Sequence, residues 1–177
     1  LRRQRQMCIR DRDLCSELGL KCLSISAGSP YYNPHMQRPA SYPPSDGYQP
    51  AHDPLVDVDR QIQVVRQLRN HAPDHIVLIG TAYSYLQEYL PHVAQHNIRE
   101  GWTDMVGLGR VTLSYPHILH DATTQGDLSP RLICRTFSDC TTAPRNGLIS
   151  GCYPLDDHYK VKPEFTQLKE IKKQVGA

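Results

Sequence analysis

The sequence Asp-Met-Val-Gly-Leu-Gly-Arg, residues 104–110, gives the clearest indication of how this chain folds. A short apolar run bounded by glycine is typical of a buried β-strand. Gly109 has no Cβ, so its backbone can approach a ligand closely, and a helical turn starting just after it would point amides at a phosphate. We therefore predict a buried strand here whose carboxyl end forms half of a phosphate-binding site.

The segments around this stretch alternate between strand and helix patterns. A helix end at 13–18 stops at Gly19, and short apolar strands are predicted at residues 20–26 and 75–80. Helices are predicted at 56–70, 84–96, 116–124 and 161–175. The helix at 84–96 is predicted to be capped by Ser84, to be kinked at Pro91 and to end in a return loop at 97–101. Such alternation predicts an α/β fold in which helices cover a parallel sheet.

Residues 30–54 interrupt this pattern with seven prolines and four tyrosines. So much proline predicts neither a helix nor a central strand. Long loops in compact domains are commonly functional, and tyrosines favour an ordered segment. We consider two interpretations, a surface excursion held by tyrosine packing and a substrate lid that contains Tyr31 and Tyr32.

The first twelve residues have no helical or strand periodicity and resemble translated sequencing-adapter DNA. We interpret residues 1–12 as a non-native segment; the alternative is a basic tail that binds nucleic acid. They hold five arginines and one aspartate, whereas the other 165 residues carry 15 basic and 17 acidic side chains. The formal net charge of +2 therefore comes from this segment, and we predict no nucleic-acid partner.

The predicted strands end in glycines followed by polar residues. Gly80-Thr81 and Gly109-Arg110 follow consecutive strands, and ligands of parallel α/β proteins bind at the carboxyl ends of strands. In eight-stranded barrels, the last two strands commonly carry a phosphate site. Arg110 would add a guanidinium to the backbone amides. The alternative for Arg110 is an ordinary surface arginine after a strand.

Residues 103–110, followed by Ser114-Tyr115-Pro116 and by three spaced cysteines, resemble the C-terminal part of the old yellow enzyme family. These proteins are NADH:flavin oxidoreductases with an FMN-binding TIM barrel, and the likeness is to the 2,4-dienoyl-CoA reductase branch. The family pattern has aspartate-proline where this chain has Tyr115-Pro116. The resemblance implies that residues 13–128 form about strands 6–8 of a (β/α)8 barrel. Residues 129–177 would then form a cysteine-containing C-terminal extension with a terminal helix.

The same resemblance implies an FMN-dependent NAD(P)H oxidoreductase of the ene-reductase type. NAD(P)H would reduce FMN, and the reduced flavin would transfer hydride to an activated alkene such as an enone or enoyl thioester. Gly80, Thr81, Gly109 and Arg110 are implied to bind the FMN phosphate. The family's catalytic residues lie upstream of the matching part, so we expect a C-terminal fragment that is not active alone. The alternatives are a phosphate-binding barrel lyase or isomerase without flavin, and a non-catalytic small-ligand binding domain.

The cysteines of the extension are interpreted separately. In the dienoyl-CoA reductase branch, four cysteines after the barrel hold a [4Fe–4S] cluster, and eleven residues separate the last two. Cys140 and Cys152 have that spacing, but the family's Cys-x-x-Cys pair is missing and Cys134 lies near its place. Clusters normally take four thiolates, so we favour three buried thiols that are the remnant of an iron–sulfur site; a [4Fe–4S] cluster at Cys134, Cys140 and Cys152 is the alternative.

The remaining expectations concern compartment and partners. No apolar run approaches the length of a membrane span, and no secretory signal precedes the cysteines. We therefore predict a cytoplasmic protein with free or metal-bound thiols, a small-molecule substrate and no membrane partner. The sequence leaves oligomer formation open.

Overall fold

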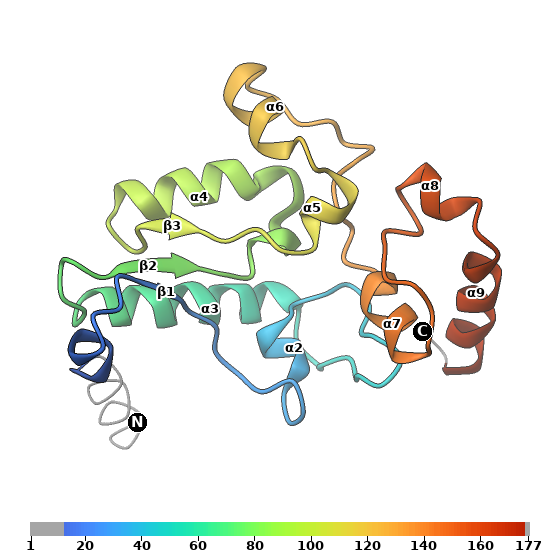
Figure 1. Cartoon of the computed structure of the whole chain (residues 1–177), viewed down its shortest axis with the longest axis horizontal. Helices are drawn as coiled ribbons and strands as arrows, with labels where there is room; N and C mark the ends of the chain where they lie inside the picture. The colour runs from blue at the N-terminus through green and yellow to red at the C-terminus, as the bar shows by residue number, and fades with distance from the viewer. Residues whose placement is uncertain (1–12, 176–177) are drawn as a thin grey trace.

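The computed structural model describes residues 13–175; residues 1–12, which include the predicted non-native segment, and 176–177 lie outside the described part. It has an α/β architecture that begins with helical residues 13–17 and a turn at Gly19, as predicted. Three strands follow in the order of the chain, each separated from the next by helical segments (Figure 1). They are β1 (Cys22–Ser24), β2 (Val77–Gly80) and β3 (Met105–Val106).

The strands form one parallel sheet with the order β1-β2-β3. Ser24 pairs with Ile79 of the central strand, and Ile79 pairs in turn with Met105. The predicted parallel sheet is therefore confirmed. The strand predicted within residues 104–110 is shorter than expected. The prediction that it is buried is wrong, because Met105 is 54% exposed at the sheet edge.

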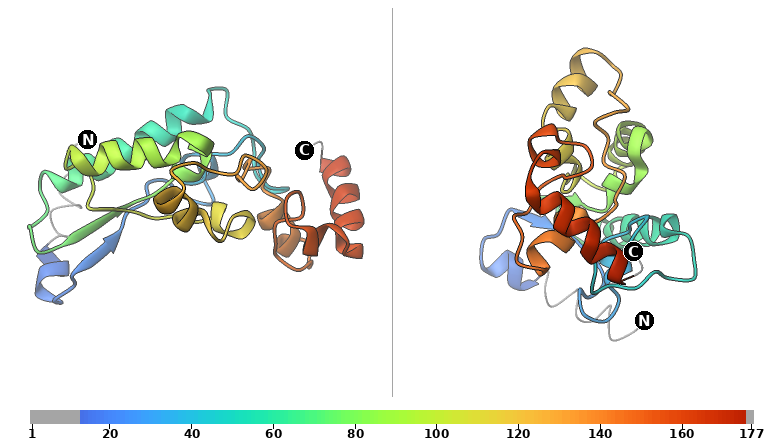
Figure 2. Two further views of the ribbon diagram at one scale, coloured as in Figure 1. Left: turned by 90° about the horizontal axis from the view of Figure 1, so that it is seen from above. Right: turned by 90° about the vertical axis from the view of Figure 1, so that its right-hand side faces the viewer.

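Two helices cover one side of this sheet. They are α3 (Pro54–Arg69) and α4 (Leu90–Arg99), and Figure 2 shows both on the same side of the strands. Val65 of α3 packs with Ile76 and Leu78 in a buried cluster that also contacts Leu23. Alternate strand residues point the other way, so Ser24 and Met105 are exposed on the second face.

The helix predicted at 84–96 differs from the observed structure. A 3-10 segment, η1 (Tyr83–Tyr89), comes first and has a non-helical residue at Gln87 (φ 52°). Pro91 then lies in the first turn of α4, where a missing N–H costs nothing, so it starts the helix rather than kinking it. The residue before η1 is Ala82 in a left-handed conformation, so Ser84 is not the cap. Because α4 continues to Arg99, the predicted return loop is shortened.

The proline-rich segment contains one helical turn, α2 (Pro34–Gln37), although its composition predicted no helix. Pro34 occupies the start of this turn, the one helical position that proline favours. Apart from Pro54, which begins α3, the rest of the segment lacks regular structure, as predicted.

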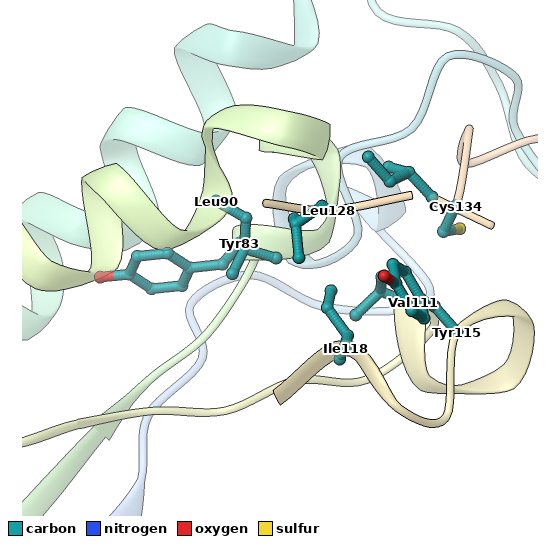
Figure 3. Packing of buried hydrophobic residues seen from close by; sticks show 8 residues of the cluster. Tyr83, Leu90, Val111, Tyr115, Ile118, Leu128 and Cys134 are labelled. Carbon is teal, nitrogen blue, oxygen red and sulfur yellow. The ribbon is translucent and has the colours of Figure 1, made fainter. Parts of the chain in front are cut away.

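The remaining helices follow the sheet in the chain. They are α5 (Val111–Ser114), α6 (Ile118–Thr124), α7 (Asp139–Arg145), α8 (Asp157–Lys160) and α9 (Pro163–Val175). Tyr83, Val111, Tyr115 and Ile118 share a buried cluster with Leu90, Leu128, Ile133 and Cys134 (Figure 3). This cluster joins the carboxyl side of the sheet to the cysteine-containing segment. Within residues 13–175, none of the helices combines the length and the apolar character that crossing a bilayer requires.

The two residues before β3 lock it to β2. Leu78 N donates to the Asp104 carboxylate at 2.7 Å, and Gly80 N donates to the buried Thr103 hydroxyl at 3.1 Å. Arg69, at the end of α3, forms an ion pair with the same carboxylate at 2.7 Å. Asp104 therefore joins α3, β2 and β3.

We predict that Asp104→Ala lowers the free energy of unfolding by about 1–3 kcal/mol, because a strand amide and a guanidinium lose their shared acceptor. Urea unfolding followed by circular dichroism measures the change. Asp74→Ala, at an exposed position in the turn before β2, is the matched control and should leave the midpoint unchanged. Equal midpoints for Asp104→Ala and the parent would contradict this role.

Candidate functional site

The carboxyl ends of β2 and β3 meet at one edge of the sheet. Gly107 N donates to Gly80 O at 2.8 Å, which brings the segments after both strands together. An added Cβ at Gly80 would lie 3.3 Å from both Thr103 Oγ1 and the Tyr83 ring. The packing of the sheet itself therefore favours glycine at position 80, whatever binds nearby.

Thr81 ties this edge to the first strand. Its hydroxyl donates to Ile25 O at 2.8 Å, directly after β1. All three strand ends are thus connected. Since the hydroxyl already has this acceptor, Thr81 is best placed to offer a ligand its backbone.

Gly109 is the most open of the predicted site residues. It is exposed, its φ is not positive, and an added Cβ would meet no atom within 4 Å. Its carbonyl accepts hydrogen bonds from Thr112 N at 3.0 Å and Thr112 Oγ1 at 2.7 Å, which close the turn into α5. The fold therefore does not require glycine here, whereas a ligand that approaches the backbone would.

Arg110 reaches from this edge to the proline-rich segment. Its guanidinium donates to Pro39 O at 2.6 Å and lines a cleft together with Arg38 and Arg145. Burial lowers the pKa of Arg110, and the nearby thiols of Cys134 and Cys140 act in the opposite direction. An arginine in this setting remains charged. The side chain is partly buried against the proline-rich segment, and the role of Arg110 as a ligand-binding or an ordinary surface arginine stays a prediction.

The other wall of this cleft comes from the cysteine-containing segment. Ser41 N donates to Thr136 Oγ1 at 3.0 Å, and Ser138 Oγ donates to Tyr42 O at 2.7 Å. Asp46 forms an ion pair with Arg145. Residues 39–46 are therefore held against residues 134–146, although almost 100 residues separate them in the chain.

The three cysteines of this segment lie in differing environments. Cys134 is buried and accepts a hydrogen bond from Thr136 N at 3.4 Å, and burial raises its pKa. Burial also raises the pKa of Cys152 to about 11, with smaller contributions from Cys134 and Cys140. Among residues 13–175, the three sulfur atoms do not form a group within 4.8 Å of one another, as ligands of a single ion would. The remnant of an iron–sulfur site stays a prediction.

The tyrosines of the predicted substrate lid project into solvent. Tyr31 is 88% exposed and Tyr32 is 85% exposed. Their backbone is held by neighbours, since Tyr48 Oη donates to Tyr32 O at 3.0 Å. Neither ring covers the cleft, and the lid stays a prediction.

A cluster that the sequence analysis missed lies beside the cleft. Asp57 has a fully buried side chain, and it accepts hydrogen bonds from His35, His52 and Arg60. Burial alone would raise the pKa of Asp57, but these three hydrogen bonds outweigh it and hold the pKa below its usual value. The sequence indicated only that an acid near a helix start is favourable; the histidines are 17 residues apart and follow no recognised spacing.

Gln61 was also missed, although it fixes the entry to the proline-rich segment. Its buried amide accepts from Ala27 N at 2.8 Å and donates to Ala27 O at 2.7 Å and Met36 O at 2.6 Å. This side chain anchors the segment after β1 to α3. A polar residue on the buried side of a predicted helix was the one available signal.

Comparisons of this chain with protein-family models, with curated proteins and with solved structures gave no match.

We predict that iodoacetamide at about pH 8 labels the exposed Cys22 well before Cys152, because the thiolate is the reactive form and Cys152 remains protonated. Labelling of Cys152 should then rise about tenfold per pH unit until the pH nears the pKa of about 11. Mass spectrometry of the digested protein measures both rates. Equal labelling rates of Cys22 and Cys152 at about pH 8 would show that burial does not protect the Cys152 thiol.

Proposed function

We propose that this chain forms the FMN phosphate-binding end of a (β/α)8-barrel NAD(P)H oxidoreductase of the ene-reductase type. The observation that carries the proposal is the meeting of Gly80-Thr81 with Gly107–Arg110 at the carboxyl edge of two paired parallel strands. This is the edge at which barrels of this architecture bind ligands.

The strand order agrees with three consecutive strands of a barrel. Sequential parallel neighbours with right-handed crossovers place every connecting helix on the same face. Here α3 and α4 both lie on one side of β1-β2-β3 (Figure 2). One half of a doubly wound sheet has the same arrangement, so the barrel assignment rests on the resemblance of residues 103–110 and not on the strand order. In a barrel, the second face, with Ser24 and Met105, would face the interior.

The residues at the strand ends fit a phosphate group. Gly109 leaves open space above its backbone, and the next residue, Arg110, contributes a positive charge. One guanidinium nitrogen of Arg110 is committed to Pro39 O, but an arginine has five N–H donors, so others remain for an anion. Thr81 would contribute its backbone N–H, since its hydroxyl donates to Ile25 O.

Flavin supplies hydride-transfer chemistry when bound, and the protein supplies binding and orientation. In this proposal, Gly109 admits the phosphate, Thr81 and Gly109 contribute backbone amides, and Arg110 compensates the phosphate charge. The docked segment 39–46 keeps Arg110 in place through Pro39. The proposed substrate class is an activated alkene, and NAD(P)H is the proposed reductant.

We predict that Gly109→Val abolishes the preference of this chain for FMN over riboflavin while leaving thermal stability unchanged. The branched side chain meets no protein atom within 4 Å of its Cβ, but it would occupy the space of the phosphate. Flavin fluorescence titration measures both ligands, and riboflavin serves as the control because it lacks the phosphate. FMN binding equal to that of the parent would place the phosphate elsewhere.

We also predict that Arg110→Ala weakens FMN binding by about ten- to hundredfold, since a charge-assisted contact contributes about 1.5–3 kcal/mol. Arg66→Ala is the control, because Arg66 lies over the Trp102 ring at 4.2 Å on an outer helix. Inorganic phosphate should compete with FMN more strongly in the parent than in Arg110→Ala. Unchanged FMN affinity would remove Arg110 from the site.

The same titrations separate this proposal from a phosphate-binding lyase or isomerase. Glycerol 3-phosphate carries the phosphate without the flavin ring. If it binds as tightly as FMN, the site recognises phosphate alone and the flavin assignment fails.

A further inference from the structure

Three potential metal ligands converge at the base of the proline-rich segment. His35 Nδ1 lies 2.7 Å from Asp57 Oδ2, and His52 Nε2 lies 2.9 Å from the same oxygen. These three atoms all lie within 4.8 Å of one another. We propose that His35, His52 and Asp57 bind a divalent transition-metal ion, with Zn²⁺ as the ion that suits the ligands best.

The fold brings the ligands together from separate elements. His35 lies in α2, His52 lies just before α3, and Asp57 lies in the first turn of α3. The two imidazole rings form a T-shaped, edge-to-face contact with centroids 5.4 Å apart, and Tyr48 contacts His35 in the same manner. The rings are therefore held in position by packing, which reduces the ordering that metal binding would require.

The surroundings of Asp57 suit a metal ligand. Its side chain is fully buried, and Arg60 donates to Oδ1 at 2.9 Å. That contact fixes the carboxylate and leaves Oδ2 directed at both histidines. Metal-binding carboxylates are commonly oriented by such outer hydrogen bonds. The positive charge of Arg60 opposes a cation, so we expect moderate rather than tight binding.

Access and geometry also permit an ion. The His35 side chain is 14% exposed and the His52 side chain is 33% exposed, so solvent reaches one side of the cluster. Zn²⁺ binds nitrogen and carboxylate oxygen at about 2.0–2.2 Å, which places tetrahedral ligand atoms roughly 3.3 Å apart. The two N–O contacts would need to lengthen by roughly 0.5 Å each to admit the ion.

Metal binding would also change the position of one proton on each ring. A neutral imidazole carries one N–H, and its metal-binding nitrogen must be the unprotonated one. The proton that each ring now directs at Asp57 would therefore move, through solvent, to the other ring nitrogen. Two histidines and one carboxylate leave a fourth position for water or a substrate atom, as in catalytic zinc sites.

Titration of the 177-residue chain with Co²⁺ tests this proposal, because Co²⁺ occupies zinc sites and has visible absorption. We expect one Co²⁺ per chain, displaced by one equivalent of Zn²⁺, without the near-ultraviolet charge-transfer band of a cobalt thiolate. Loss of an outer hydrogen-bond partner of a metal ligand weakens metal binding by about 10- to 100-fold. Because His35→Gln and His52→Gln each remove a ligand itself, each should weaken Co²⁺ binding by more than that. His92→Gln, on α4, is the matched control and should bind as the parent does.

Circular dichroism of each variant shows whether it remains folded, and His52→Gln is the safer variant because its side chain is the more exposed of the two histidines. Absence of Co²⁺ binding by the folded parent would overturn the proposal. Binding that survives both histidine substitutions would also overturn it, as would a thiolate band that disappears in Cys134→Ser. Asp57 would then be a buried carboxylate satisfied by three hydrogen bonds. None of these outcomes depends on FMN binding, so this proposal and the proposed function can fail separately.

Discussion

Parallel pairing of β2 with β3, locked by Thr103 and Asp104, is the interaction on which the candidate site depends. The Thr103 hydroxyl accepts a hydrogen bond from Gly80 N, and the Asp104 carboxylate accepts one from Leu78 N. These bonds fix β3 to β2, although only Met105–Val106 forms regular strand. This register brings Gly107 N to Gly80 O. The convergence of the two strand ends follows from it.

A second constraint determines where the charged side chains lie. The proline-rich segment is held at one end by Gln61 and along its length by residues 136–146. Arg110 extends into this interface and donates to Pro39 O. The segment thus links the strand ends, the arginine-lined cleft and the His35–His52–Asp57 cluster. A change in how the proline-rich segment packs would therefore alter the strand ends, the cleft and the cluster together.

The sequence predicted the periodic parts of this fold. Apolar runs at 20–26, 75–80 and 104–110 predicted the three parallel strands, and the stripe through 56–70 predicted α3. The prediction failed where a local rule was overridden by context. Pro91 could equally mark a kink or a helix start, and only the left-handed Ala82 and the non-helical Gln87 decide for a start. Burial of residues 104–110 was overestimated because β3 lies at the edge of the three-stranded sheet.

The candidate site was predictable to a similar extent. Gly80, Thr81, Gly109 and Arg110 could be placed at one sheet edge because parallel strands share their carboxyl side. The contact between Arg110 and Pro39 could not be predicted from the sequence, because the two residues lie 71 positions apart and neither residue belongs to a motif. The contacts of His35 and His52 with Asp57 could not be predicted either, because an irregular proline-rich segment has no periodicity that indicates the direction of its side chains.

The most direct test of a phosphate site at the ends of β2 and β3 is nuclear magnetic resonance of the ¹⁵N-labelled chain titrated with FMN and, separately, with riboflavin. The backbone amides report where the phosphate lies without any substitution. The proposed FMN site predicts that the largest amide shifts specific to FMN fall on Thr81, Gly109 and Arg110. Equal shifts with both ligands at these residues, or FMN-specific shifts confined to the C-terminal α8–α9 region, would contradict it.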